Sequence, residues 1–310
     1  MNNTPQQLHI PVLLDAVLDL LAPKKGENYL DLTAGYGGHA REVIARIGSA
    51  NLATLVDRDE FAIEHLRDLE HDGARLIHAD FLSSAEKLQA EQAKFDMILL
   101  DLGVSSPQLD HEERGFSFRT NGDLDMRMDR SQDLTAAEIL NRRPEKSLAE
   151  IIAKYGEESP RTAARIVREI VLTRKKTPLK TTFELSELVK KVKGSGGKRN
   201  PATQTFQAIR IAVNDELGQL ERTLPILPSL LKPGGRLAII SFHSLEDRIV
   251  KNFLKEQDEA GFEAELTILT RHAVSGEKFD NNPRARSAKL RAAVKINNKK
   301  ENLDAYSSSQ

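Results

Sequence analysis

Short apolar runs alternate with amphipathic segments along the first hundred residues. Four of these runs have the length and composition of strands: residues 29–32, 52–56, 75–79 and 95–100. Between the first two, apolar residues recur at helical spacing and the pattern stops at Gly48, a residue suited to ending a helix. Residues 95–100 are apolar almost without a break, which is typical of a strand buried on both faces of a parallel sheet. The alternation predicts a doubly wound α/β sheet.

The pattern changes after Asp101. Residues 110–130 are rich in Gly, Asp and Arg and show no clear period. Helical periods then follow at residues 148–155, 161–173 and 181–192. Thr181 and Glu184 have the spacing of a capping box and open the last of these helices. The segment therefore predicts a helical insertion.

The α/β pattern resumes after residue 200. An apolar stripe from Phe206 to Leu224 predicts one helix, and a turn at residues 232–235 precedes a strand at 236–242. A further helix at 245–255 and strands at 266–271 and 287–296 complete the pattern. We expect one α/β domain, residues 1–108 and 200–298, interrupted between its fourth and fifth strands by a helical insertion at 109–199. The tail, residues 299–310, is expected to be disordered.

Composition narrows the chemistry. The 310 residues include no cysteine, which excludes disulfides, thiolate metal sites, iron–sulfur clusters and cysteine nucleophiles. Hydrophobic residues make up 39% of the chain and charged residues 29%, as in globular proteins. The sequence shows neither a signal peptide nor an apolar run of the ~18 residues that a membrane span needs, so we expect a cytoplasmic protein with no membrane partner.

Charge is balanced overall but not locally. The net charge is −1, whereas residues 161–200 carry 12 Lys and Arg against 3 Glu, and residues 281–300 carry 7 Lys and Arg and no acid. Two basic segments suggest contact with a polyanion. Solvated helix faces are the ordinary alternative for one such run. The second segment is harder to explain in that way, because five of its cations fall in one strand region with no compensating acids: Arg284, Arg286, Lys289, Arg291 and Lys295.

A glycine-rich turn follows the first strand. The pattern Gly35-x-Gly37-x-x-Ala40 lies between a strand and a helix, and Asp57 ends the second strand about twenty residues later. Glycines let the main chain approach a ligand, the helix start offers free N–H groups, and the acid accepts bonds from ribose hydroxyls. The same geometry serves NAD and S-adenosylmethionine (SAM), so the motif predicts a nucleoside-bearing cofactor.

The end of the fourth strand helps to separate these two cofactors. Asp101 begins a segment that runs through Ser105, Ser106 and Pro107 to Gln108. The carboxyl end of a strand is where an α/β sheet presents its ligand, and amino-methyltransferases typically place a short loop with an acid or serine and a proline there. The alternative, that Ser106 and Pro107 simply end the strand, is equally compatible with the pattern.

The fifth strand ends in Phe242 and His243. A lone histidine is more often a structural hydrogen-bonding group than a catalyst, and Glu246 and Asp247 are explained as carboxylates favoured at a helix start. Phe242 either stacks on a splayed-out base or is an ordinary buried residue at a strand end. The eight histidines show no paired metal-ligand spacing, so we predict no required metal.

Several longer motifs resemble the RsmH/MraW family of bacterial ribosomal RNA methyltransferases. They run in order from residue 9 to about 296: 9–14, 31–39, 101–110, 114–118, 124–129, 200–210, 241–251 and 282–287. The resemblance implies a class I, Rossmann-like sheet and SAM-dependent methylation of the N4 amino group of a cytidine in small-subunit (16S) ribosomal RNA, in the decoding region. SAM is then the methyl donor and the small ribosomal subunit the partner.

The resemblance also implies a set of SAM contacts: Gly37, Gly38, His39, Asp57, Phe81, Asp101 and Gln108. Of these, Asp57 is expected to bind the ribose hydroxyls and Phe81 to lie against the adenine face. Leu32 departs from the family pattern, where a smaller residue is expected. Asp101, Ser105 and Ser106 are our catalytic candidates, because acceptors for the N–H groups of cytosine N4 help that nitrogen to shed a proton.

Other functions fit parts of the sequence. An NAD-dependent oxidoreductase accounts for the glycine turn and Asp57 but not for the loop after the fourth strand. A non-enzymatic factor that binds ribosomal RNA accounts for the basic segments and leaves the nucleoside site unexplained. DNA N4-cytosine methylation is the nearest chemical rival. The oligomeric state, a homodimer included, stays open.

Overall fold

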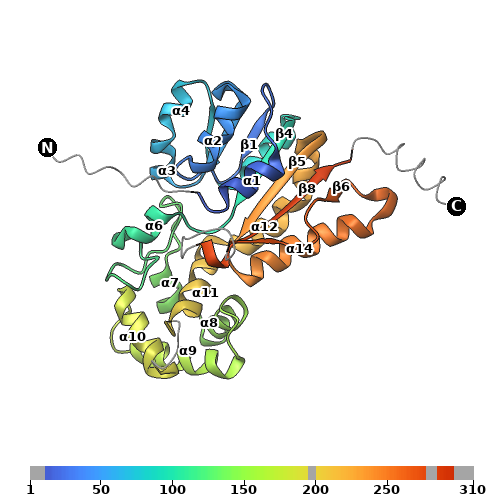
Figure 1. The fold of residues 1–310 in the computed structure, drawn as a ribbon. Coiled ribbons are helices and arrows are strands. Elements are labelled where there is room, and N and C mark those ends of the chain that lie inside the picture. Colours follow the sequence, from blue (N-terminus) through green and yellow to red (C-terminus); the bar gives the residue numbers. More distant parts are fainter. Residues whose placement is uncertain (1–10, 195–199, 277–284, 297–310) are drawn as a thin grey trace. The chain divides into compact units, whose positions relative to one another are not determined.

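The computed structural model describes residues 11–194, 200–276 and 285–296, apart from the side chains of residues 106 and 107. The chain divides into two compact units. We call Met1–Gly103 with Gly218–Gln310 the sheet unit, and Val104–Leu217 the helical unit (Figure 1). The predictions made for Arg284 and for the tail at 299–310 lie outside the described residues.

An eight-stranded sheet forms the centre of the sheet unit. Its strands are β1 (Tyr29–Asp31), β2 (Ala53–Asp57), β3 (Arg75–His78), β4 (Phe95–Asp101), β5 (Leu231–Ser241), β6 (Leu266–Ile268), β7 (Val274–Ser275) and β8 (Lys289–Lys295). The order is β3-β2-β1-β4-β5-β8-β6, with β7 also paired to β8. The first five strands in that order are parallel, and β8 is antiparallel to both of its neighbours in it. Because parallel strands all point the same way, the residues that follow β1, β2, β4 and β5 gather at one edge of the sheet.

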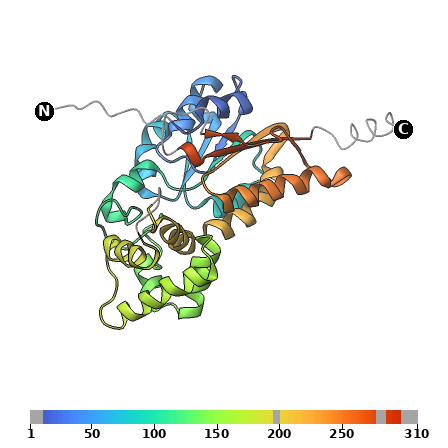
Figure 2. The same cartoon turned by 60° about the horizontal axis from the view of Figure 1, so that its bottom comes forward.

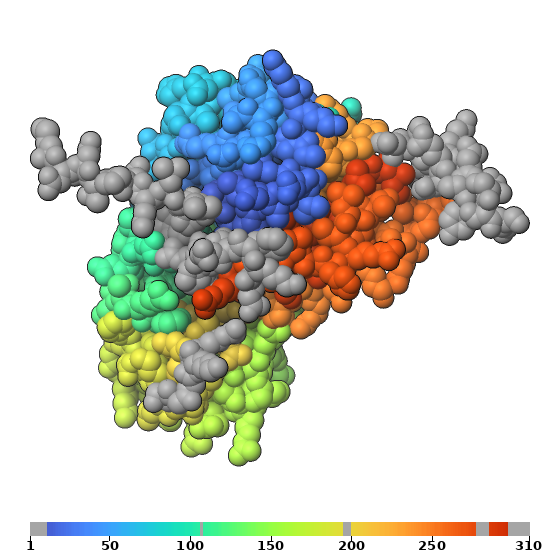
Figure 3. Space-filling model, in the orientation of Figure 1, coloured from blue at the N-terminus to red at the C-terminus, as the bar shows by residue number. Residues whose placement is uncertain are grey.

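Helices cover both faces of this sheet (Figures 1 and 2). They are α1 (Leu14–Leu21), α2 (Gly38–Ile47), α3 (Glu60–His65), α4 (Arg67–His71), α5 (Phe81–Ala90), most of α12 (Glu216–Thr223), α13 (Leu227–Leu230) and α14 (Ser244–Glu259). Alternate strand residues enter two separate cores, as a two-residue period requires. Leu55 and Leu99 pack under α1 and α2, whereas Val56 and Leu100 pack under α5, α13 and α14. On the face shown in Figure 3, the blue and orange surfaces of this unit adjoin.

The helical unit has its own core. Its helices are α6 (Ser106–Asp110), α7 (Ala136–Arg142), α8 (Glu145–Tyr155), α9 (Pro160–Arg174), α10 (Thr182–Lys193) and α11 (Thr203–Asn214). One continuous cluster of buried side chains joins them, with Ile139, Ile152, Ile166 and Phe206 among its members. The predicted capping box of α10 is present, since Thr181 accepts from the N–H of Glu184 and the Glu184 carboxylate accepts from the N–H of Thr181.

The predicted α/β class, with a helical segment between the fourth and fifth strands, is confirmed. Two details are wrong. The single helix expected from Phe206 to Leu224 is broken at Asp215, which adopts a φ of +47° and separates α11 from α12. Residues 232–235, expected as a turn, lie inside β5, where a register shift opposite residues 95–97 accommodates them. Among the described residues, no helix is long and apolar enough to cross a bilayer.

Candidate active site

The glycine turn joins β1 to α2 at the carboxyl edge of the sheet. Gly35 and Gly37 adopt φ values of +53° and +82°, which are unfavourable for residues that have a Cβ. A Cβ at Gly37 would lie 2.9 Å from Leu66 Cδ2, and one at Gly38 would lie 2.7 Å from Pro11 Cγ, so packing explains why these two residues are small. A Cβ at Gly35 would meet only Thr33 O, at 3.9 Å. Open space therefore lies beside Gly35, and no side chain caps the start of α2.

Asp57 ends β2 and braces this turn. Its Oδ2 accepts a hydrogen bond from the Gly35 N–H at 2.8 Å, and its Oδ1 accepts one from the Asp59 N–H at 2.8 Å. Burial raises the pKa of Asp57, and these two bonds partly offset the rise. Each carboxylate oxygen has a second lone pair, so Asp57 retains acceptor capacity for ribose hydroxyls.

Asp101 ends β4 and carries an unsatisfied oxygen. Its main-chain N–H donates to Thr33 Oγ1 at 2.6 Å, which fixes the end of β4 against the end of β1. Its Oδ1 is buried and accepts no hydrogen bond from the described residues. Such an atom is costly in a folded protein unless a ligand satisfies it. Burial, reinforced by the charges of Asp31 and Glu246, raises the pKa of Asp101 well above its usual range.

Asp31 is a second buried acid at this edge, and it is not among the site residues predicted from the sequence. It is 1% exposed and accepts hydrogen bonds from Tyr29 Oη at 2.8 Å and from the Thr33 N–H at 3.1 Å. Burial raises its pKa to about 7, with Asp57 adding to the rise. We call Asp31, Asp57, Asp101 and Glu246 the carboxyl cluster. The raised pKa values of Asp31, Asp57 and Asp101 mean that these buried carboxyl groups favour a positively charged ligand.

His39 links the start of α2 to this cluster. Its Nε2 lies 3.0 Å from the carbonyl oxygen of Val12, so Nε2 must carry a hydrogen. Its Nδ1 faces Asp101 Oδ2 at 3.6 Å. This distance is too long for a hydrogen bond, so His39 lies beside Asp101 without fixing the position of a proton on it.

The end of β5 contributes Phe242, His243 and Glu246. Phe242 is half-buried, and its Cδ2 lies 3.3 Å from where a Cβ on Gly103 would be, which favours the interpretation of Phe242 as a packed strand-end residue. His243 caps α14: its Nδ1 accepts from the Glu246 N–H at 3.3 Å. The Glu246 carboxylate in turn accepts from the N–H groups of Phe242 and His243. The helix dipole alone, as expected from sequence, is thus an incomplete account of Glu246.

The remaining predicted residues belong to other elements. Phe81 begins α5 and its ring is buried in the core beneath that helix. Ser105 and Gln108 belong to the helical unit, where Ser105 Oγ accepts from the Gln108 N–H at 3.4 Å and Gln108 Oε1 accepts from the Ser105 N–H at 3.0 Å. Ser106 begins α6. The structure thus brings Gly37, Gly38, His39, Asp57 and Asp101 to one sheet edge, and the roles assigned to all nine predicted residues stay predictions.

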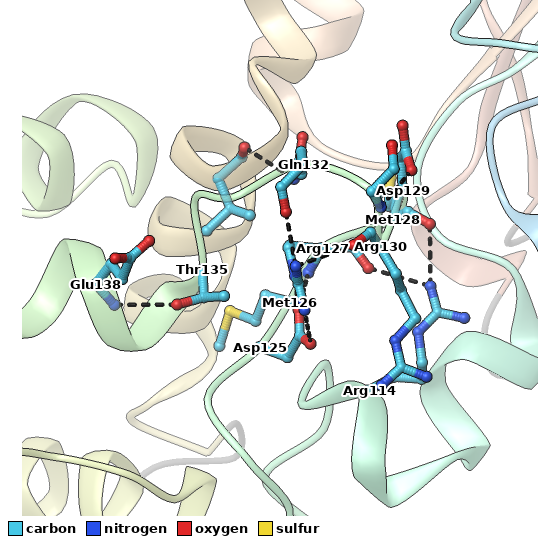
Figure 4. A network of polar contacts seen from close by, with 12 residues as sticks. Arg114, Asp125, Met126, Arg127, Met128, Asp129, Arg130, Gln132, Thr135 and Glu138 are labelled. Atoms are coloured by element: carbon cyan, nitrogen blue, oxygen red, sulfur yellow. Dashed lines mark hydrogen bonds and ion pairs between the residues drawn. The ribbon is translucent and has the colours of Figure 1, made fainter.

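In the helical unit, side chains hold the loop at residues 125–132 in one conformation (Figure 4). Arg127 is bidentate to Asp125, with distances of 2.7 and 2.9 Å. It also donates to the carbonyl oxygens of Arg130 and Gln132 at 3.0 and 2.6 Å. These bonds replace the main-chain ladder that a helix or strand would supply.

Two further side chains form hydrogen bonds to the main chain of the same loop. Arg114, 3% exposed, donates to the carbonyl oxygen of Met128 at 3.0 Å. Asn214 accepts from the Met128 N–H at 2.9 Å and donates to the Met126 carbonyl at 2.8 Å. Met126 itself has a φ of +60°, a conformation that this network imposes on a residue other than glycine.

The two basic segments differ in the structure. In the second, Lys289 and Arg291 both pair with Asp247 at 2.8 Å, and Lys295 pairs with Glu265 at 2.6 Å. The prediction that this segment has no compensating acids is therefore wrong, because Asp247 in α14 and Glu265, just before β6, supply them across the fold.

In the first basic segment, Lys191 pairs with Glu169 at 2.8 Å. Lys175 and Lys176 are exposed and form no ion pair with any described residue. They are the better candidates for contact with a polyanion.

The residues at the sheet edge fit SAM. The space beside Gly35 suits a ligand that approaches the main chain, Asp57 suits a ribose, and the carboxyl cluster suits a sulfonium. At the same edge, Asp101 Oδ1 is a buried acceptor without a hydrogen-bond donor among the described residues, so a bound ligand can supply the donor.

Sequence comparison identifies the family of this chain. A profile of the MraW methylase family matches residues 6–296. The chain belongs to that family. The resemblance identified from the motifs is thereby confirmed.

Individual relatives agree in name. The ribosomal RNA small subunit methyltransferase H of Synechocystis sp. is 48% identical over 297 residues, which cover 93% of each chain. A protein of the same name from Rickettsia bellii is 45% identical over 311 residues, covering 94% of this chain and 100% of its own. Among solved structures, a putative rRNA-methylase from Clostridium thermocellum is 13% identical with a TM-score of 0.45, covering 93% of this chain and 100% of its own.

Proposed function

We propose that this chain transfers a methyl group from SAM to the N4 amino group of a cytidine in the 16S ribosomal RNA of the small subunit, in the decoding region. The observation that carries the proposal is Asp101, whose buried Oδ1 lacks a hydrogen-bond donor at the sheet edge that holds the glycine turn. An amino group supplies such a donor. The names of the relatives support the ribosomal substrate, which would place the enzyme in the bacterial cytoplasm.

SAM supplies a methyl group bonded to a positively charged sulfur. The main chain at residues 35–39 would lie along the ligand, Asp57 would bind the ribose, and Phe81 would lie against the adenine. Asp31 and Asp101 complement the positive charge from fixed positions. Such fixed charges stabilise a ligand without reorganising around it. Gln108 would complete the contacts.

The amino group needs help from acceptors, because the lone pair of cytosine N4 is delocalised into the ring. A hydrogen bond from the N4 amino group to Asp101 Oδ1 localises that lone pair on nitrogen. When the new N–C bond forms, the electron pair of the broken S–C bond stays on sulfur, and Asp101 takes the proton that N4 releases. The hydroxyls of Ser105 and Ser106 are proposed as further acceptors.

The helical unit would bind the RNA. Lys175 and Lys176 are exposed and unpaired among the described residues, so they are available to phosphates. Changing both to Gln should weaken RNA binding and lower its dependence on salt. Lys24 and Lys25, an adjacent exposed pair in the sheet unit, are the matched control. Equal losses from both pairs would contradict the assignment to the helical unit.

The test of the function is transfer of labelled methyl from SAM to three acceptors: assembled small subunits, naked 16S ribosomal RNA and cytosine-containing DNA. Mass spectrometry should identify N4-methylcytidine in the RNA. Transfer to DNA alone would contradict the proposal. We expect transfer to persist after the enzyme has been treated with a chelator and dialysed, because we predict no required metal.

Variants test the assigned residues. Asp101→Asn should lower kcat by about 10²-fold or more, in the range for loss of a positioned proton acceptor. Ser105→Ala with Ser106→Ala should lower kcat by a smaller factor. Undiminished turnover in the serine double variant would remove both hydroxyls from the mechanism.

A further inference from the structure

His243 carries a second unsatisfied polar atom at the sheet edge, and its tautomer is determined by the fold. Nδ1 accepts the Glu246 N–H at 3.3 Å and therefore bears no hydrogen. The ring is then neutral, with its hydrogen on Nε2. That atom is buried and forms no hydrogen bond with the described residues. Glu246 Oε1 lies 3.2 Å away, but outside hydrogen-bonding geometry.

This donor and the unsatisfied acceptor of Asp101 belong to the ends of adjacent strands at the same edge of the sheet. Strands β4 and β5 are parallel neighbours, with Asp101 in register with Ile240, three residues before His243. Glu246 connects the two groups, because its charge raises the pKa of Asp101 and its carboxylate lies against the His243 ring. One sheet edge therefore presents a buried acceptor on Asp101 and a buried donor on His243.

Cytosine has the complementary pair of groups. Its N4 amino group is a donor, and the adjacent ring nitrogen N3 is an acceptor. Uracil presents the reverse, an acceptor at position 4 and a donor at N3. A neutral Nε2–H on His243 can donate to N3 of cytosine, whereas it faces another donor at N3 of uracil. The buried donor is then left unpaired with uracil, which is a strong basis for discrimination between the two bases.

We propose that His243 is a specificity-determining residue that donates a hydrogen bond from Nε2 to ring N3 of the target cytidine while Asp101 accepts from N4. This inference rests on the proposed function and adds to it the recognition of the base.

The test removes the proposed hydrogen bond between His243 Nε2 and cytidine N3, once by changing the substrate and once by changing the enzyme. On the substrate, 3-deazacytidine at the target position replaces N3 by C–H in the RNA of a reconstituted acceptor. On the enzyme, His243→Asn retains a side chain that caps α14 well but does not reach as far as Nε2. His71→Asn, at an exposed position in α4, is the control.

For the native enzyme, 3-deazacytidine should lower kcat/KM on the order of tenfold. His243→Asn should show a similar loss with cytidine, little further loss with 3-deazacytidine, and an unchanged Kd for SAM. The altered intrinsic reactivity of 3-deazacytidine affects both enzymes equally and cancels in the comparison. The His71→Asn control should behave as the native enzyme.

Two results would decide against the inference. Either the deaza substitution lowers kcat/KM by the same factor in the native enzyme and in His243→Asn, or it has no effect in either. Absence of N4-methylcytidine when the native enzyme acts on unmodified acceptors would instead overturn the proposed function.

Discussion

Replacing Asp31 by Asn should stabilise the protein near neutral pH and above. Asp31 is 1% exposed, and burial raises its pKa from 3.8 to about 7. In the unfolded chain the group ionises near its usual pKa, so between these two values the native state holds a proton that the unfolded state has lost. Stability therefore falls as the pH rises through this window. The complete loss, reached above about pH 7, is roughly 4 kcal/mol.

Asparagine keeps the shape of the side chain and its acceptor for the Thr33 N–H. Its amide NH2 replaces the oxygen that accepts from Tyr29 Oη, so it donates to that phenol oxygen instead, and it carries no charge to desolvate. The gain for Asp31→Asn should be about 2–4 kcal/mol near pH 8 and should vanish below about pH 4. Urea denaturation followed by circular dichroism across this range measures it. Asp15→Asn, at an exposed position in α1, is the control. A difference between variant and native protein that stays constant with pH would refute the reasoning.

Three further outcomes are expected. The affinity for SAM should rise with pH through about 7, because ionised members of the carboxyl cluster attract a sulfonium, whereas the neutral product S-adenosylhomocysteine should depend less on pH; calorimetric titration of both at several pH values tests this, and a constant ratio of affinities would contradict it. Gly37→Ala should lower stability by about 1–3 kcal/mol more than Gly26→Ala in thermal unfolding, since both positions have positive φ, +82° and +86°, but a Cβ meets a close neighbour only at Gly37. Asn214→Ala, which removes two bonds to the loop at residues 125–132, should destabilise the helical unit by about 2–4 kcal/mol, and hydrogen exchange should quicken in that loop but not in β4.

Much of the fold was predictable because apolar periodicity is a local signal. The continuous apolar run at residues 95–100 predicted a buried parallel strand, and β4 occupies it. Asp215 broke the expected helix through a left-handed conformation, which an apolar stripe does not reveal. The pairing of Lys289 and Arg291 with Asp247 joins residues more than 40 positions apart, so no local charge count could anticipate it.

The candidate site was predictable where a motif has a fixed spacing, as with Gly35, Gly37 and Asp57. Asp31 was missed as a site residue, although Tyr29 and Asp31 are two positions apart in one strand and therefore share a face. His243 was assigned a structural role, which it has as a helix cap. The role that we propose for it in base recognition rests on the burial of Nε2 without a hydrogen-bond partner among the described residues, which depends on tertiary packing.

The interruption of the sheet by the helical unit has a consequence for synthesis on the ribosome. The adjacent strands β4 and β5 pair Asp101 with Ile240. More than 130 residues must therefore be synthesised after Asp101 before its partner in β5 is available. The helical unit, made in between with a core of its own, can fold while the sheet is incomplete. Once folded, it shortens the effective loop that joins β4 to β5 and lowers the entropy lost on closing it. The nascent chain meanwhile exposes an open edge of β4, which makes early folding of the insertion a protection against aggregation.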